Sequence, residues 1–275
     1  MDSLLAALPV ELLWYLGLSL VICLPGFYRV VYFISTGYAF SIAAIAGGSL
    51  WLLRDTLTPL AALHAVGLLL YGLRLGGFLL RREFTSAGYR RELEEAQEAS
   101  SRIKLPGLLG IWVGVALLYV AMASPAVYAL ASPAPTGAML GLQAAGLAAL
   151  FGGLALETWA DRQKSAYKLL HPDRFCDVGL YRWVRCPNYL GEVIVWVGSF
   201  AAGVGAYGHW ARWTTATVGL VCILLIMVGS TRRLELKQDE RYGEREDYRA
   251  YVAKTPILWP LLPIYSFRNA RIYLG

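Results

Sequence analysis

The residues best suited to chemistry stand in the stretch RCPNYLGEVIVWVG, residues 185–198. Pro187 suits the first turn of a helix, and Asn188 and Glu192, four residues apart, then share one helix face. A carboxylate this close to hydrocarbon usually faces the interior of a bundle or a wet cavity, where it has a partner. The pattern favours a site for a polar ligand at the mouth of an apolar helix. The alternative interpretation is a glutamate that only interacts with the positive end of the helix dipole.

A second group of polar residues interrupts the apolar stretch LHAVGLLLYGLRLGGFLLRR, residues 63–82. Tyr71 and Arg74 are three residues apart, so they are adjacent on a helix surface. A cation beside a tyrosine favours its phenolate form, which makes Tyr71 a candidate proton donor to a carbonyl oxygen. The alternative is a tyrosine of the interfacial aromatic belt beside an arginine that extends toward the headgroups.

The elements that must position these residues are membrane helices. Only 16% of the 275 residues are charged and the mean hydropathy is +0.49, whereas soluble domains carry about 25% charged residues. Windows long enough to cross a bilayer recur along the chain. Seven such spans are predicted, at residues 6–25, 28–53, 57–80, 105–131, 136–159, 188–208 and 212–230. The fold class is therefore all-α and polytopic, and we expect one integral-membrane domain over 1–275.

The distribution of basic residues predicts the topology. Twenty-one of the 25 Lys and Arg residues fall in three segments, 80–104, 160–187 and the tail after 230. With seven spans, all three segments lie on one side, and the positive-inside rule makes that side cytoplasmic. The N-terminus is then outside, and 231–275 is a cytoplasmic tail that packs on the membrane face. The net charge of +6 is explained in this way, without a nucleic-acid partner.

Some kinds of site are not indicated. The four cysteines and three histidines are scattered and no C-x-x-C pair occurs, so we expect no metal centre. No G-x-G-x-x-G follows a strand pattern and no G-x-x-x-x-G-K-[ST] occurs, which argues against a Rossmann fold or a P-loop. A nucleotide would have to bind among the helices and the basic inner loops.

The motif GLYRWVRCPNYLGE, residues 179–192, resembles the signature of the steroid 5α-reductase C-terminal-domain superfamily. It is closest to the DUF1295 branch, which typically reads G-L-W-R-Y-x-R-H-P-N-Y-x-G-E. YGLRL…LLRR and the tail YRAYVAKTPILWP are similar to the same branch. The resemblance runs from about residue 30 to 263. It implies a membrane reductase that uses NADPH to reduce the conjugated C=C bond of a lipid enone, such as a 3-oxo-steroid.

The resemblance also implies roles for individual residues. Asn188 and Glu192 would contact the nicotinamide half of NADPH, and Tyr71 would bind the substrate carbonyl with Arg74 beside it. Other expected cofactor contacts come from the inner loop and the last span: Asp161, Lys164, Lys168, Tyr181, Arg182, Arg185, Tyr189, Arg232, Arg233 and Glu235. The substrate would be a lipid or steroid-like molecule, in a bacterial cytoplasmic membrane or, in a eukaryote, the endoplasmic reticulum.

The chain also departs from the family pattern. Steroid reductases place a Gln-Glu pair on the second helix as the partner of the carbonyl-binding tyrosine, and Ser35-Thr36 stands at the matching place here. Ser35, Thr36 and Tyr38 are the candidate replacements. The usual R-H-P reads Arg185-Cys186-Pro187.

Two other functions are compatible with the sequence. Isoprenylcysteine and phospholipid methyltransferases share the C-terminal architecture, in which Arg232, Glu235, Tyr248 and Tyr251 would serve S-adenosylmethionine. A non-enzymatic lipid-binding protein that kept the fold is the third hypothesis.

Overall fold

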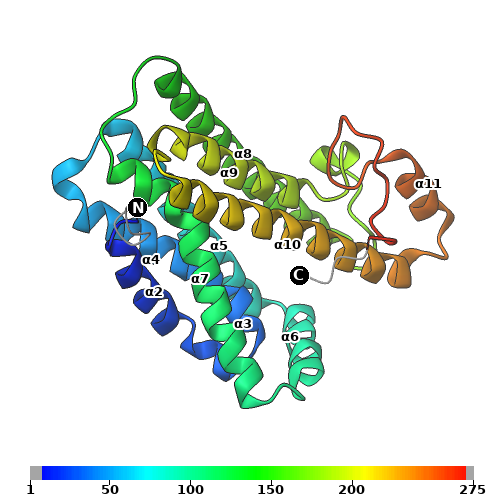
Figure 1. Ribbon diagram of the computed structural model, residues 1–275. Coiled ribbons are helices and arrows are strands. Elements are labelled where there is room, and N and C mark those ends of the chain that lie inside the picture. The colour runs from blue at the N-terminus through cyan, green and yellow to red at the C-terminus, as the bar shows by residue number, and fades with distance from the viewer. Residues whose placement is uncertain (1–7, 271–275) are drawn as a thin grey trace. The chain divides into compact units, whose positions relative to one another are not determined.

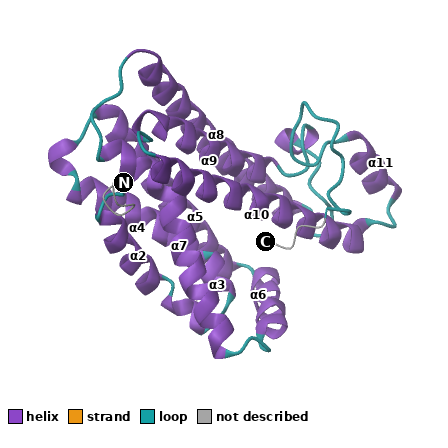
Figure 2. Ribbon diagram, in the orientation of Figure 1, coloured by secondary structure: helices purple, strands orange, loops and turns teal. Residues whose placement is uncertain are grey.

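The structure is a computed structural model that describes residues 8–270. These residues form helices joined by short loops, without strands (Figure 2). Six helical segments among them are long and apolar enough to cross a membrane: Val31–Leu52, Pro59–Thr85, Leu105–Leu130, Gly137–Leu170, Pro187–Ala206 and Trp210–Tyr242. The predicted all-α membrane fold is confirmed, and the protein is an integral membrane protein.

The first predicted span differs from the other six. Within the described residues its α-helix is α2, Glu11–Ile22, followed by the 3-10 helix η1, Leu24–Phe27. At 1.5 Å per residue α2 is about 18 Å long, against a hydrocarbon core of about 30 Å. Residues 6 and 7 of that span lie outside the described part. The count of seven spans and the orientation of the termini therefore remain predictions.

The chain divides into two compact units. Unit 1 contains residues 1–147 and 199–219, and unit 2 contains 148–198 and 220–275. In unit 1, α4 (Thr36–Leu52) packs with α2, with α5 (Pro59–Thr85) and with α7 (Leu105–Leu130) (Figure 1). The short α3, Val31–Ile34, precedes α4, and the helix breaks at Ser35, where φ is −116° and ψ is −92°. The amphipathic α6, Ala87–Ser100, follows α5.

Unit 2 is built on parts of three long helices and on the tail. These helices are α8 (Gly137–Leu170), α9 (Pro187–Gly203) and α10 (Trp210–Tyr242), followed by α11 (Glu246–Lys254). Both α8 and α10 continue about eleven residues past the predicted ends of their spans. Residues 160–170 and 231–242 are polar but contain no proline and no glycine that would end a helix, so part of each predicted loop or tail is helical.

Candidate functional site

Helices α8 and α9 of unit 2 touch at two glycines. A Cβ atom placed on Gly153 would lie 2.6 Å from the carbonyl oxygen of Gly191, and one placed on Gly191 would lie 2.7 Å from the backbone nitrogen of Glu157. Small residues permit such close approach between membrane helices. The crossing sets Glu157 of α8 directly against the start of α9.

The first two turns of α9 carry the polar residues Asn188 and Glu192. Pro187 is the first residue of the helix, as predicted. Glu192 is buried, and the side-chain oxygen Oδ1 of Asn188 is buried and accepts no hydrogen bond from any described residue. An unpaired buried carbonyl oxygen is costly, so Asn188 has the capacity to bind a ligand that donates a hydrogen bond.

Three carboxylates are buried around this crossing. Glu157 and Asp161 lie four residues apart on α8, and Glu192 lies on α9. Within residues 8–270, no cluster of three His, Cys, Asp or Glu side chains has the arrangement of a metal site. Carboxylates accept hydrogen bonds from hydroxyl, amide and ammonium groups, so this region suits a ligand that is rich in such donors.

Arg185 and Glu235 form a fully buried ion pair. The guanidinium Nη2 of Arg185 lies 2.8 Å from Oε1 of Glu235, and the two side chains are 1% and 0% exposed. The second oxygen of Glu235, Oε2, accepts the backbone N–H of Phe267 at 2.8 Å, and Nη2 of Arg185 also donates to the carbonyl of Tyr265. Both residues were predicted to contact a cofactor, but here they bind each other and the tail. The buried Nε of Arg185 has no hydrogen-bond partner among the described residues.

The tail also pairs with the segment before α9 through its backbone. The N–H groups of Arg185 and Cys186 donate to the carbonyls of Pro256 and Ile257 at 2.9 and 3.0 Å. Cys186 is buried in a cluster with Ile257 and Leu258. The cysteine that replaces the usual histidine therefore belongs to an apolar contact with the tail.

The reactivity of Cys186 tests this packing. Burial raises the pKa of its thiol to about 11, so the thiolate is scarce below that pH and nucleophilic attack is slow. We expect Cys186 of the folded protein to resist a disulfide reagent at about pH 8 and to react after denaturation, as followed by mass spectrometry of its peptide. Labelling at the rate of a free cysteine would contradict the buried contact.

Several other predicted contacts are structural in unit 2. The ammonium of Lys168 donates to the carbonyls of Pro172 and Arg174 and, at 2.9 Å, to the hydroxyl of Tyr242. The Tyr181 hydroxyl donates to the carbonyl of Ala160 at 3.3 Å. Lys168 and Tyr181 therefore stabilise the loop between α8 and α9 through these hydrogen bonds.

The remaining basic residues of the prediction differ in exposure. Arg182 and Arg233 are exposed, whereas Arg232 is half-buried and its Nε donates to the carbonyl of Arg268 at 3.2 Å. Lys164 and Tyr189 are half-buried. Arg182 and Arg233 are thus the exposed cations among the predicted site residues of unit 2.

Hydrogen bonds from Tyr248, Tyr251 and Arg268 hold the tail to α10 and to the loop before α9. Asp239 accepts hydrogen bonds from the Tyr248 hydroxyl at 2.9 Å and from Nε of Arg268 at 2.7 Å. The Tyr251 hydroxyl donates to the carbonyl of Tyr181 at 2.6 Å. The Y-x-x-Y spacing singled out these two tyrosines in the sequence, and in the structure both form hydrogen bonds that hold the tail.

Unit 1 brings Tyr71 to Tyr38. Their hydroxyl oxygens are 2.7 Å apart and both side chains are buried. The contact follows from a close crossing of α4 and α5, where a Cβ on Gly72 would lie 2.4 Å from the carbonyl oxygen of Ala39. Ser35, in contrast, donates its hydroxyl to the carbonyl of Val31 at 2.8 Å.

Two other predicted residues of unit 1 have different neighbours. The guanidinium carbon of Arg74 lies 5.7 Å from the ring centroid of Phe78, within cation–π range. Thr36 is half-buried at the start of α4. Among the three candidate replacements for the missing carboxylate, Tyr38 is therefore the one bonded to Tyr71.

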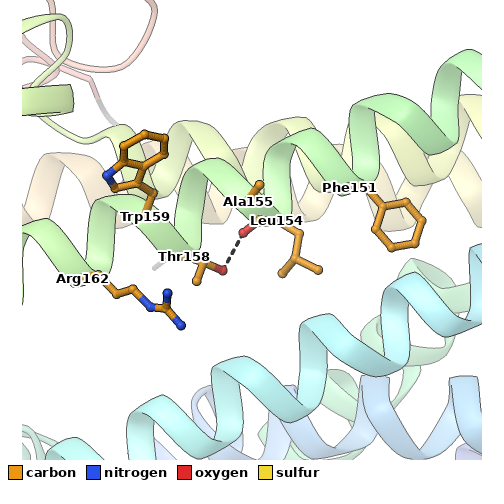
Figure 3. A pocket seen from close by; sticks show the side chains of 6 residues that line it. All are labelled: Phe151, Leu154, Ala155, Thr158, Trp159 and Arg162. Carbon is orange, nitrogen blue, oxygen red and sulfur yellow. Dashed lines mark hydrogen bonds between the residues drawn. The ribbon is translucent and has the colours of Figure 1, made fainter.

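The side of α8 opposite the crossing borders an open hollow. Figure 3 shows Phe151, Leu154, Thr158 and Arg162 on one side of this helix, and Ala155 and Trp159 complete the lining. The Thr158 hydroxyl is bonded to the carbonyl of Leu154 at 2.6 Å, so this face is apolar until it reaches Arg162. Such a face suits an acyl chain or another long apolar group.

Comparison with known proteins agrees with this arrangement of motifs. A family model described as "Protein of unknown function (DUF1295)" matches residues 27–255, which include Tyr38, Tyr71 and the α8–α9 crossing. The chain belongs to the DUF1295 family. The uncharacterized protein C594.04c of Schizosaccharomyces pombe is 37% identical to this chain over 98 residues. That alignment covers 35% of this chain and 27% of the yeast protein, and no solved structure matches the chain.

Proposed function

We propose that this DUF1295 protein is a membrane-embedded reductase that uses NADPH to reduce a conjugated C=C bond of a lipid. The observation that carries the proposal is the buried, unpartnered Oδ1 of Asn188 on the same face of α9 as the buried Glu192. A nicotinamide carboxamide carries both a donor NH₂ and an acceptor oxygen, and the Asn188 amide complements both. The resemblance of the GLYRWVRCPNYLGE motif to the reductase signature supports the same assignment.

The residues of unit 2 fit such a cofactor. Asn188 and Glu192 would hold the carboxamide, while Glu157 and Asp161 would accept hydrogen bonds from ribose hydroxyls. Arg182 and Arg233 would neutralise the phosphates, because they are exposed cations. When bound, NADPH supplies the hydride, and the protein supplies orientation and charge. Following the positive-inside prediction, this end of unit 2 faces the cytoplasm.

The tyrosine pair of unit 1 is suited to protonation of a carbonyl. The Tyr38 hydroxyl would stabilise, by a hydrogen bond, the charge that develops on the Tyr71 oxygen when Tyr71 gives its proton to a substrate oxygen. Tyr38 thereby takes the place of the missing carboxylate. The apolar face of α8 with Arg162 at its end supports a lipid as the substrate class.

Removing the Asn188 amide should weaken NADPH binding. We expect Asn188→Ala to lose about tenfold in affinity, which corresponds to one hydrogen bond to a buried group, with little change in stability without ligand. The matched control is Asn269→Ala, because Asn269 is exposed in the tail. Equal affinity in Asn188→Ala and the wild type would remove Asn188 from the site.

Removing the Tyr71 hydroxyl should affect turnover and spare binding. We expect Tyr71→Phe to reduce the rate of NADPH oxidation with a panel of lipid enones by about 100-fold or more, as for loss of a general acid, with unchanged NADPH affinity. Tyr119→Phe is the control, because its buried hydroxyl donates to the backbone carbonyl of Phe33. Full activity of Tyr71→Phe would exclude the tyrosine from the chemistry.

One observation supports a second candidate, an S-adenosylmethionine-dependent methyltransferase. Glu157, Asp161 and Glu192 are buried together in unit 2, and carboxylates also suit the ammonium and sulfonium groups of that cofactor. The residues expected to serve it are otherwise engaged: Glu235 pairs with Arg185, Tyr248 with Asp239, and Tyr251 with the carbonyl of Tyr181. A lipid-binding protein without catalysis is the third candidate, and the same ligand titrations separate the three.

A further inference from the structure

We propose that residues 257–264 of the tail form a membrane anchor, whose apolar tip inserts at the boundary between headgroups and acyl chains. We call these residues the tail loop. The inference does not depend on the cofactor or on any reaction. It rests on the shape of the loop, on its level along α9, and on the apolar side chains that it exposes.

The tail loop is closed by a backbone hydrogen bond, and the residues at its base are buried. The N–H of Ile257 donates to the carbonyl of Ile264 at 2.9 Å, which ties the two ends together. Ile257 and Leu258 at its base are fully buried, and the ring of Trp259 contacts that of Phe267 edge-on, with centroids 5.9 Å apart. Pro260 and Pro263 restrict the backbone of the tip. The loop is therefore closed at its base, and its tip has a restricted backbone.

The backbone bonds set the level of the loop. Arg185 and Cys186 bond to Pro256 and Ile257, and the apolar span of α9 begins at the next residue, Pro187. The tail loop accordingly lies level with the end of a membrane span. At this level a protein surface meets the headgroup region of the bilayer.

The tip presents apolar side chains at that level. Leu261 is 94% exposed and Leu262 is 49% exposed. Trp183, two residues before the paired segment, is 73% exposed, and tryptophan is enriched at membrane interfaces. Two leucines at a proline-restricted tip would be costly in water, whereas at this depth lipid covers them.

Nearby charges favour the same occupant. Arg182 precedes Trp183, Lys254 precedes the loop, and both side chains are exposed. Cations that flank exposed apolar groups are typical of segments that lie in the interface of an anionic leaflet. A lipid surface therefore fits the tail loop better than a soluble protein partner.

Fluorescence quenching in vesicles tests the anchor. Leu261→Cys would be made in a Cys222→Ser background, since the other three cysteines are buried, and labelled with an environment-sensitive NBD dye. The matched control is Glu244→Cys, at an exposed residue just beyond the end of α10. Both proteins would be reconstituted into phosphatidylcholine–phosphatidylglycerol vesicles with spin-labelled lipids as shallow or deep quenchers, and with iodide as the aqueous quencher.

The anchor predicts a blue-shifted emission at Leu261→Cys that the shallow lipid quencher removes for the most part and that iodide barely affects. The Glu244→Cys probe should show the reverse. Equal iodide quenching at both positions would overturn the proposal. A Leu261→Cys probe shielded from both iodide and lipid quenchers would overturn it as well, because a protein surface would then cover the tip.

Discussion

Glu235→Ala is expected to destabilise unit 2 by about 3–5 kcal/mol, the usual cost of leaving one member of a buried ion pair without its partner. The substitution leaves the guanidinium of Arg185, whose side chain is 1% exposed, without its carboxylate partner. It also removes the acceptor of the Phe267 N–H. The tail should detach as a result. Thermal unfolding would show the loss of stability, and limited proteolysis would show faster cleavage after residue 255.

Two further variants distinguish the loss of the Arg185–Glu235 ion pair from a general effect of substitutions on α10. Glu240→Ala, at an exposed position of the same helix, should change little. Arg185→Leu with Glu235→Leu replaces both charges by apolar groups, and we expect it to recover most of the lost stability, because no unpaired charge remains. A Glu235→Ala protein as stable as Glu240→Ala would contradict the buried pair.

Gly153→Ala is expected to destabilise the α8–α9 crossing by about 1–3 kcal/mol, the range for overpacking of a close contact. The added methyl group would meet backbone atoms, Gly191 O at 2.6 Å and Val195 N at 2.7 Å, and backbone cannot rotate away as a side chain can. The helices must therefore separate. Because Asn188 and Glu192 stand on the displaced turns of α9, NADPH binding should weaken as well.

The neighbouring residue provides the control. A Cβ on Gly152 meets no atom within 4 Å, so Gly152→Ala should be neutral or stabilise the helix by up to about 1 kcal/mol, since alanine is the better helix former. The two variants differ by one position, and the melting temperature should fall in Gly153→Ala but not in Gly152→Ala. A shift of the same sign and size in both would show that the crossing is not tight.

Local patterns were sufficient to predict the six long apolar helical segments of the described residues. Pro187 marks the start of α9 as expected, and the faces of Asn188 and Glu192 follow from helical spacing. The ends of α8 and α10 were predicted too early because the apolar window ended there, while the helical backbone continued through polar residues. The break at Ser35 divides the second span into α3 and α4, and it was not predicted from the sequence, although Gly37 stands two residues later, where a Cβ would lie 2.6 Å from the carbonyl oxygen of Tyr32.

The roles of the site residues stay predictions, and several contacts between these residues could not be predicted because they join positions far apart in the sequence. Tyr38 and Tyr71 come together because Gly72 lets α5 approach α4, a contact between residues 33 positions apart. Arg185 and Glu235 were assigned to a ligand because each is a charged residue in a motif. Their pairing spans 50 positions, and no local spacing reveals it. The same holds for the bond from Tyr251 to the carbonyl of Tyr181.

The measurement that tests the central claim most directly is the thermal stability of the purified protein in detergent, titrated separately with NADPH and S-adenosylmethionine. A ligand that binds only the folded state stabilises it by about 2.7 kcal/mol at a hundred times its dissociation constant. We predict a saturable rise in melting temperature with NADPH and none with S-adenosylmethionine. A rise with S-adenosylmethionine alone would contradict the reductase and identify a methyltransferase, and no rise with either would favour a lipid-binding protein without catalysis.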